Sequence, residues 1–125
     1  MRLCAFRKSG ELFFIFKATY EPGLIDGVEL HPTVLRGPGY PNAPEQDSFL
    51  RAPGSETVLQ VWQSEEGGRF FCDLNLHQVV LLSGEVDPLP ENCTALSLRE
   101  IEALAPRGVF TNEARSTLSL LLACR

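Results

Sequence analysis

Residues 11–19 have the sequence ELFFIFKAT, and this stretch decides the fold. Side chains alternate between the two faces of a strand, so a half-exposed strand shows apolar residues only at every second position. The segment 13–16 is apolar at every position. It therefore predicts a strand that is covered on both faces. Glu21-Pro22-Gly23 is expected to end this strand, because proline and glycine interrupt regular structure.

The segments on either side extend this first strand into a sheet. Residues 2–6 form a second apolar run, and the intervening RKSG at 7–10 is typical of a hairpin loop. Residues 27–34 predict a short strand that contains Pro32, which cannot donate to a ladder and indicates an edge strand or a bulge. Residues 36–56 are rich in proline and glycine, and we expect a long loop there, with a lid favoured over a disordered segment.

The second half of the chain predicts more strands. Residues 57–64 and 69–73 flank EEGG at 65–68, which indicates a second hairpin. Residues 76–82 form a further apolar strand. We therefore expect about six strands in all.

Two helices are expected at the C-terminal end. Ser97-Leu98-Arg99-Glu100 has the pattern of a capping box, and the helix that it begins should end before Pro106. Thr111 or Asn112 can cap the second helix. The residues expected along one face of that helix are Ala114, Leu118, Leu121 and Leu122, with Arg115 and Ser119 on another face. Strands followed by helices predict one α+β domain over residues 1–125.

Composition excludes several classes of partner. The formal charge is −5 at pH 7 and there is no basic stripe, which disfavours nucleic acid and anionic membranes. The chain has no apolar run long enough to span a bilayer, and residues 1–8 lack the pattern of a signal peptide, so a cytoplasmic location is expected. The cysteines Cys4, Cys72, Cys93 and Cys124 form no C-x-x-C pair, which favours reduced thiols.

Familiar catalytic signatures are also missing from the sequence. There is no G-x-x-x-x-G-K-[ST], G-x-G-x-x-G, H-E-x-x-H or G-x-S-x-G motif. The two histidines, His31 and His77, stand far apart in the sequence, which disfavours a transition-metal site. A small anionic ligand stays compatible with the composition, because a few arginines can bind one phosphate whatever the net charge.

The densest group of polar residues is QSEEGGR at 63–69. Alternation along a strand would place Gln63 and Glu65 on the same face, with Arg69 as the nearest partner for the carboxylate. A solvated hairpin turn and a binding site explain this composition equally well.

Two further groups of polar residues have alternative explanations. Residues 112–116, NEARS, begin a helix, where free N–H groups favour an anion and Arg115 could bind a carboxylate or phosphate. An exposed arginine on an amphipathic helix is the commoner case. Glu29 and His31 share a face of the short strand, and each of them alone is more often an ordinary polar residue than a catalyst.

Taken together, five blocks in order resemble the NDP-hexose 2,3-dehydratase family. The blocks are EPG at 21–23, VEL at 28–30 with PTV at 32–34, QSEEGGRF at 63–70, Asn75, and NEARS at 112–116. The resemblance implies one module of a longer chain of two tandem modules, with a Nudix-like mixed sheet or partial barrel. It also implies a cofactor-free and metal-free elimination of water from a nucleotide-linked 4-keto-6-deoxyhexose, as used in deoxysugar and natural-product biosynthesis.

The resemblance carries a set of pocket residues with it. These are Glu29, Gln63, Glu65, Arg69, Asn75, Asn112 and Arg115. Among them, Arg69 or Arg115 would bind the anion, Asn75 and Asn112 would contact hydroxyl or carbonyl groups, and Glu65 or Glu29 would transfer the proton. His77 is a candidate for a second base. We expect the acidic turn and the start of the last helix to meet around one cavity.

Three functions stay open at this point. They are a sugar dehydratase, a lyase for another β-hydroxy ketone, and a non-catalytic ligand-binding or interaction module with the same fold. Residues 92–96, NCTAL, lie where the family is expected to have aromatic residues, and Cys93 and Ala95 supply none. A single module would also leave an apolar surface exposed, which predicts an isologous homodimer.

Overall fold

The computed structural model describes residues 1–20, 23, 27–36, 48–49, 51–64 and 74–123. Its strands are β1 (Arg2–Lys8), β2 (Glu11–Tyr20), β3 (Val28–Pro32), β4 (Glu56–Ser64), β5 (Leu74–Leu81) and β6 (Cys93–Ser97). Its helices are α2 (Leu98–Leu104) and α3 (Asn112–Ala123), with the 3₁₀ turn η1 (Ala105–Arg107) between them. The predicted α+β class, with its strands ahead of two C-terminal helices, is confirmed.

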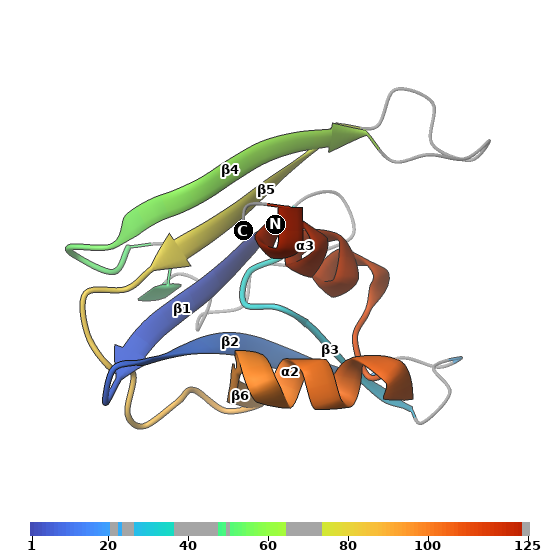
Figure 1. Cartoon of the computed structure of the whole chain (residues 1–125), viewed down its shortest axis with the longest axis horizontal. Helices are drawn as coiled ribbons and strands as arrows, with labels where there is room; N and C mark the ends of the chain where they lie inside the picture. Colours follow the sequence, from blue (N-terminus) through green and yellow to red (C-terminus); the bar gives the residue numbers. More distant parts are fainter. Residues whose placement is uncertain (21–22, 24–26, 37–47, 50, 65–73, 124–125) are drawn as a thin grey trace.

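The strands form one mixed, open sheet. Neighbouring strands follow the order β3-β2-β1-β5-β4, and β6 pairs with β2 outside this path. The pair β1–β5 is parallel, and the other pairs are antiparallel. Figure 1 shows α2 and α3 on the same side of the sheet, with β4 at its outer edge.

The predicted first hairpin is confirmed. Its turn consists of Ser9 and Gly10, which have φ angles of 51° and 81°. Two consecutive left-handed residues give a turn whose twist matches that of the strands. In β2, Phe14 and Phe16 pack on the side of the helices and Ile15 packs on the other side, so this strand is covered on both faces as predicted.

The sheet separates two apolar clusters. The helix-side cluster contains Leu3, Ala5, Phe14, Phe16, Val79, Ile101, Phe110 and Ala114. The far-side cluster contains Cys4, Phe6, Ile15, Val34, Phe49, Val80 and Leu82. Phe49 belongs to the range predicted as a long loop or lid, of which residues 37–47 and 50 lie outside the described residues.

Thr33 joins the two strands of the first hairpin where they separate. The pairing of β1 with β2 ends at Cys4–Ile15, and β3 pairs with β2 from Phe16 onward. The buried Thr33 hydroxyl accepts a hydrogen bond from the Cys4 N–H at 2.8 Å and donates one to the Ile15 carbonyl. Pro32 is the last residue of β3, which is an edge strand as predicted.

Leu30 fixes the start of α3. Its N–H donates to the Val109 carbonyl at 2.7 Å, and its carbonyl accepts from the Thr111 N–H at 2.9 Å. The Thr111 hydroxyl then caps the helix by accepting from the Ala114 N–H at 3.3 Å. The segment before α3 therefore adds a short parallel bridge to the edge of β3.

The predicted second hairpin, of residues 57–64 with residues 69–73, stays a prediction, because only its first strand is described. The partner of β4 is β5, with Glu56 opposite Leu81 and Ser64 opposite Leu74. The expected partner at 69–73 lies outside the described residues. This pairing is favoured because β5 buries Val79 in the helix-side cluster and Val80 in the far-side cluster. Strand β6 was not predicted, since Cys93–Ser97 has no strong strand signal.

The two helices follow the sequence signals with one correction. The capping box of α2 is confirmed: the Ser97 N–H donates to Glu100 Oε2 at 2.7 Å, and the Glu100 N–H donates to Ser97 Oγ at 3.3 Å. The apolar face predicted for α3 is rotated. Its buried residues are Ala114, Thr117 and Leu120, whereas Leu122 is 59% exposed.

No helix in the described part of the chain is long and apolar enough to cross a membrane.

Replacing Thr33 with valine should destabilise the protein by about 3 kcal/mol, because two buried backbone groups each lose a partner worth about 1–3 kcal/mol. Urea unfolding measures this change. Thr19→Val, on the half-buried part of β2, is the matched control and should change the free energy of unfolding much less. Equal effects of the two substitutions would contradict the role of the Thr33 hydroxyl.

Candidate functional site

Three polar residues share the helix side of the β4–β5 pair, and we call them the polar strip: Gln63, Asn75 and His77. Gln63 lies directly opposite Asn75 in the register. His77 is two residues further along β5, and Val79, two residues beyond it, belongs to the helix-side cluster. Alternation along β5 therefore turns the strip toward the side of the sheet on which α3 packs.

Helix α3 contacts the strip through Thr117. Nδ1 of His77 lies 3.0 Å from the Thr117 hydroxyl oxygen, and that hydroxyl donates to the Glu113 carbonyl at 2.9 Å. A hydroxyl has one hydrogen, so Thr117 accepts from His77. The network assigns the proton of the neutral imidazole to Nδ1 and leaves the lone pair on Nε2.

The surroundings of His77 favour the neutral imidazole. The side chain is only 2% exposed. Burial lowers the pKa of His77 below its usual 6.5, and the positive charge of the Met1 amino group adds to this effect. The Glu113 carboxylate acts in the opposite direction and does not reverse the shift. His77 is thus a neutral group with a fixed tautomer at pH 7.

The other predicted site residues lie elsewhere or outside the described chain. Glu29 is opposite Thr19, one position from the Ala18–Leu30 pair. Since Leu30 packs against the helix-side cluster, Glu29 is on the far side of the sheet from the strip. Glu65 and Arg69 lie outside the described residues, so their expected meeting with the last helix stays a prediction.

Asn112 and Arg115 form a pair on the surface of α3. The Arg115 guanidinium donates to Asn112 Oδ1, and both residues are exposed. Residues 113 and 115 are on opposite sides of a helix. Glu113 is therefore the member of the NEARS block on the same side as Thr117, while Arg115 lies on the side toward α2.

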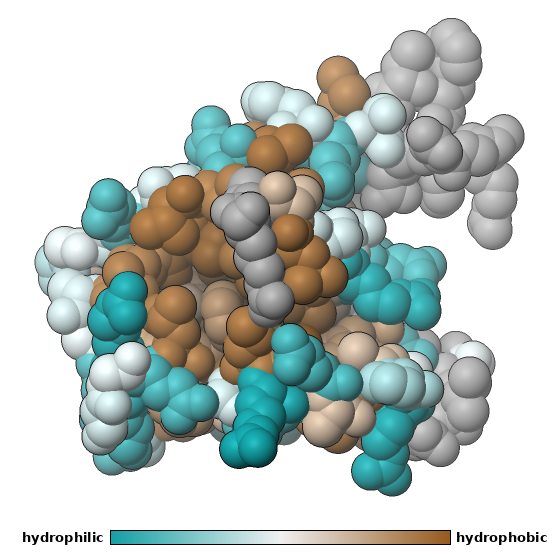
Figure 2. Space-filling model, viewed as in Figure 1, coloured by the Kyte–Doolittle hydropathy of each residue, from teal (hydrophilic) through white to brown (hydrophobic). Residues whose placement is uncertain are grey.

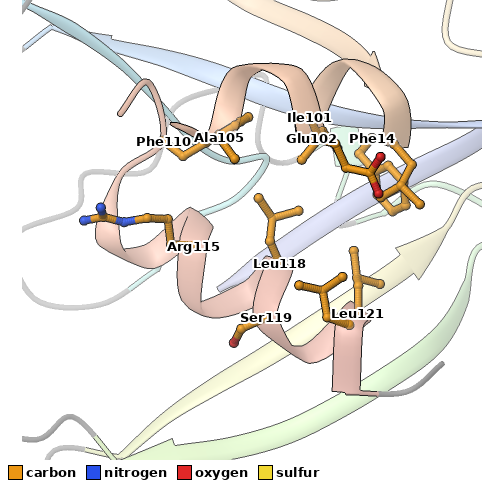
Figure 3. A pocket seen from close by; sticks show the side chains of 11 residues that line it. Phe14, Ile101, Glu102, Ala105, Phe110, Arg115, Leu118, Ser119 and Leu121 are labelled. Atoms are coloured by element: carbon orange, nitrogen blue, oxygen red, sulfur yellow. The ribbon is translucent and has the colours of Figure 1, made fainter. Parts of the chain in front are cut away.

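An apolar groove occupies the space between α2 and α3. Its volume is about 370 Å³. Figure 3 shows Leu118 and Leu121 pointing toward Ile101 and Phe14 across it, with Glu102 and Arg115 as its charged residues. The space-filling view shows apolar residues gathered around this part of the surface (Figure 2). A groove of this composition offers few partners for sugar hydroxyls or a diphosphate.

The described residues include no group of three or more His, Cys, Asp or Glu side chains that could hold a metal ion. Cys4 is a free thiol, and burial raises the pKa of Cys4 to about 11, so that this residue stays protonated. Cys72 and Cys124 lie outside the described residues. His31, which shares its face with Glu29, is buried with Nδ1 2.6 Å from the Pro32 carbonyl oxygen.

Thr117 and Glu113 were not predicted as site residues. The available signal was a threonine within the apolar pattern of α3, four residues after a glutamate. A buried hydroxyl among apolar neighbours needs a partner, and this could have pointed to a polar group on the sheet.

The fold and the polar strip define a small α+β module that holds a neutral histidine beneath a C-terminal helix. Comparison with protein families then identifies it: residues 1–121 match the NDP-hexose 2,3-dehydratase family, and the chain belongs to that family. The expected resemblance is confirmed.

Several curated relatives are dTDP-4-dehydro-6-deoxy-alpha-D-glucopyranose 2,3-dehydratases. One from Streptomyces violaceoruber is 35% identical over 92% of this chain and 26% of the relative. One from Saccharopolyspora spinosa is 32% identical over 90% of this chain and 24% of the relative. A third, from Amycolatopsis orientalis, is 34% identical over 88% of this chain and 24% of the relative. The chain spans about a quarter of the length of these relatives.

The shifted pKa of His77 predicts how stability depends on pH. Because the folded protein binds the proton less well than the unfolded chain, His77 makes stability fall as the pH drops below 6.5. His77→Gln should reduce this slope between pH 6.5 and the lower folded pKa. Urea unfolding across this pH range measures it. Ser119→Ala, on the exposed side of α3, should retain the wild-type slope, and an unchanged slope in His77→Gln would refute the burial of a neutral imidazole.

Proposed function

We propose that this chain forms a hydro-lyase site that removes water across C2 and C3 of a nucleotide-linked 4-keto-6-deoxyhexose. Membership of the dehydratase family and the activity for which the relatives are named support the reaction class. The observation that carries the proposal within the structure is the hydrogen bond from His77 to Thr117, which leaves a neutral imidazole with its lone pair on Nε2.

The reaction needs a base, a group that stabilises the enolate, and an acid. The C4 ketone acidifies the hydrogen on C3, so a base can remove it and the electron pair moves onto the ketone oxygen. When the enolate collapses, the C2–O bond breaks and the leaving hydroxyl takes a proton to become water. The product first carries a C2=C3 double bond with the C3 hydroxyl attached, and this enol becomes a ketone.

In this proposal His77 is the base, acting through Nε2. A neutral imidazole suits the task because burial lowers the pKa of His77 and so keeps the Nε2 lone pair unprotonated at pH 7. Gln63 and Asn75 share its face and supply amide donors for the ketone oxygen or a hydroxyl. Because His77 is buried, the sugar must approach from the half-buried Gln63–Asn75 end of the strip.

The remaining roles come from the family resemblance. Glu65 is proposed as the acid, and Arg69 as a contact for the diphosphate. Arg115 and Asn112 are proposed as a second anion contact, since a guanidinium and a helix N-terminus both favour phosphate. Glu29 is omitted because it lies on the other side of the sheet.

The proposal also covers the setting of the reaction. We assign residues 1–125 to one domain of the Nudix-like class. A mixed sheet with both helices on one face is compatible with this class. The free thiol of Cys4 supports a cytoplasmic location. Exposed apolar residues, among them Val58 and Trp62, support a second copy of the chain as partner.

Incubation with the 4-keto-6-deoxy nucleotide sugar in deuterated water tests the reaction. We expect loss of water from the substrate, detected by mass spectrometry, and exchange of deuterium at C3. His77→Gln should lower kcat by at least about a hundredfold, the usual contribution of a general base, with a smaller change in KM. Ser119→Ala should stay active. If the wild-type protein causes neither deuterium exchange nor loss of water, the dehydratase assignment is ruled out.

A thermal-shift measurement with thymidine diphosphate separates catalysis from binding alone. A ligand that binds only the folded state raises the apparent stability by RT ln(1 + [L]/Kd). We expect a higher Tm that is lost in Arg69→Ala or Arg115→Ala. A shift without turnover would favour the non-catalytic binding module, and no shift in the wild-type protein would contradict the nucleotide contact.

A further inference from the structure

Strand β4 has a bare edge within the described chain. It spans nine residues and ends the strand order, with β5 on one side and no described strand on the other. Figure 1 shows it at the rim of the sheet, outside the helices. An edge of this length presents backbone N–H and C=O groups that can pair with another strand.

Apart from the bulge between Thr57 and Leu59, β4 has little of the usual protection of an edge strand. It contains no proline, lysine or arginine, and its one charged residue is Glu56 at the first position. Val58 is 53% exposed and Trp62 is 63% exposed. Natural edge strands commonly place lysine or proline at such positions to prevent pairing.

The exposed apolar residues of β4 lie on one face. Trp62 is opposite Leu76, and Gln60 is opposite Gln78, whose neighbour Val80 belongs to the far-side cluster. Alternation places Val58 on the same face as Gln60 and Trp62. The bulge between Thr57 and Leu59 ends the regular ladder there, so Val58 is the first residue that can join a regular pairing.

We propose that two copies of this chain pair antiparallel through β4, with a two-fold axis beside Gln60. In this register Gln60 lies opposite its own copy, and Val58 lies opposite Trp62 of the partner subunit. On the other face, Leu59 lies opposite Val61 of the partner subunit. The sheet then continues from one copy into the next.

The strand is self-complementary in this register. An aromatic residue opposite a β-branched residue is a favourable cross-strand pair, and the two-fold axis makes this pair twice. Glu56, the one charged residue of β4, lies beyond the bulge and outside the paired residues 58–62, so no like charges meet in the ladder. The inference rests on the second copy of the chain that the proposed function names as partner, and it specifies the surface through which the two copies pair. It needs no assumption about the substrate.

Charged substitutions at Gln60 test the register. Gln60→Lys and Gln60→Glu each place like charges across the two-fold axis, and each should weaken the dimer by at least about tenfold. An equimolar mixture of the two variants should form a heterodimer at low ionic strength. Light scattering after size-exclusion chromatography gives the masses, while far-UV circular dichroism and urea unfolding establish that both variants fold.

Ser119→Lys and Ser119→Glu, on the exposed side of α3, are the matched control and should stay dimeric alone and mixed. The chain has one tryptophan, so its emission reports on this interface directly. Dilution of the wild-type protein should shift the Trp62 emission to the red as the dimer separates.

Two outcomes would overturn the inference. If the wild-type protein stays monomeric at micromolar concentration, no dimer forms and the inference is wrong. A dimer that persists unchanged in both Gln60 variants shows that another surface forms it. Neither outcome bears on turnover, so failure here is distinct from failure of the dehydratase assignment.

Discussion

The position of the candidate site depends on the backbone of Leu30. Both of its hydrogen-bonding groups pair with the segment before α3, while the same residue lies opposite Ala18 in the β2–β3 pair. The start of α3 is therefore attached to the edge of the sheet, and the helix must cross β3, β1 and β5, the strands that it contacts. Thr117, just over a turn into the helix, comes to lie over His77 for this reason. A looser start would allow α3 to rotate, and the apolar side of the helix offers little to restore the contact.

The same attachment explains which parts of the sheet stay uncovered. Helix α2 is fixed by its capping box at the end of β6, next to β2. Helix α2 covers the β2–β6 part of the sheet and α3 covers its middle, and neither described helix packs closely on β4. The strand that holds Gln63 is consequently both the wall of the polar strip and the bare edge. A change in the backbone of β4 will also affect Gln63, because Gln63 belongs to this strand.

The sequence predicts the elements whose signals are local. The first hairpin, the covered β2 strand, the edge position of Pro32 and the capping box at Ser97 each depend on neighbours within a few residues. The pairing of β4 with β5 could not be predicted in the same way, because the register depends on which apolar residues fill the two clusters. The site shows the same limit. Glu29, Gln63 and Asn75 were selected through the family resemblance and His77 as a candidate base, but only the register shows that Glu29 is on the other face. The NEARS block was correctly placed at the start of a helix, whereas the side on which Glu113 and Arg115 lie depends on how α3 docks.

Thr117 shows how one side chain serves both the packing and the chemistry. Valine has nearly the same shape and would fill the same space, but it would leave the buried Nδ1–H of His77 without a partner. The imidazole could then escape that cost by moving its proton to Nε2, which would remove the lone pair from the position that the proposed reaction uses. The hydroxyl prevents this exchange because its own hydrogen is already donated to the Glu113 carbonyl. The hydrogen bond between α3 and β5 is thus the same contact that selects the tautomer, and a helix displaced from β5 would lose both together.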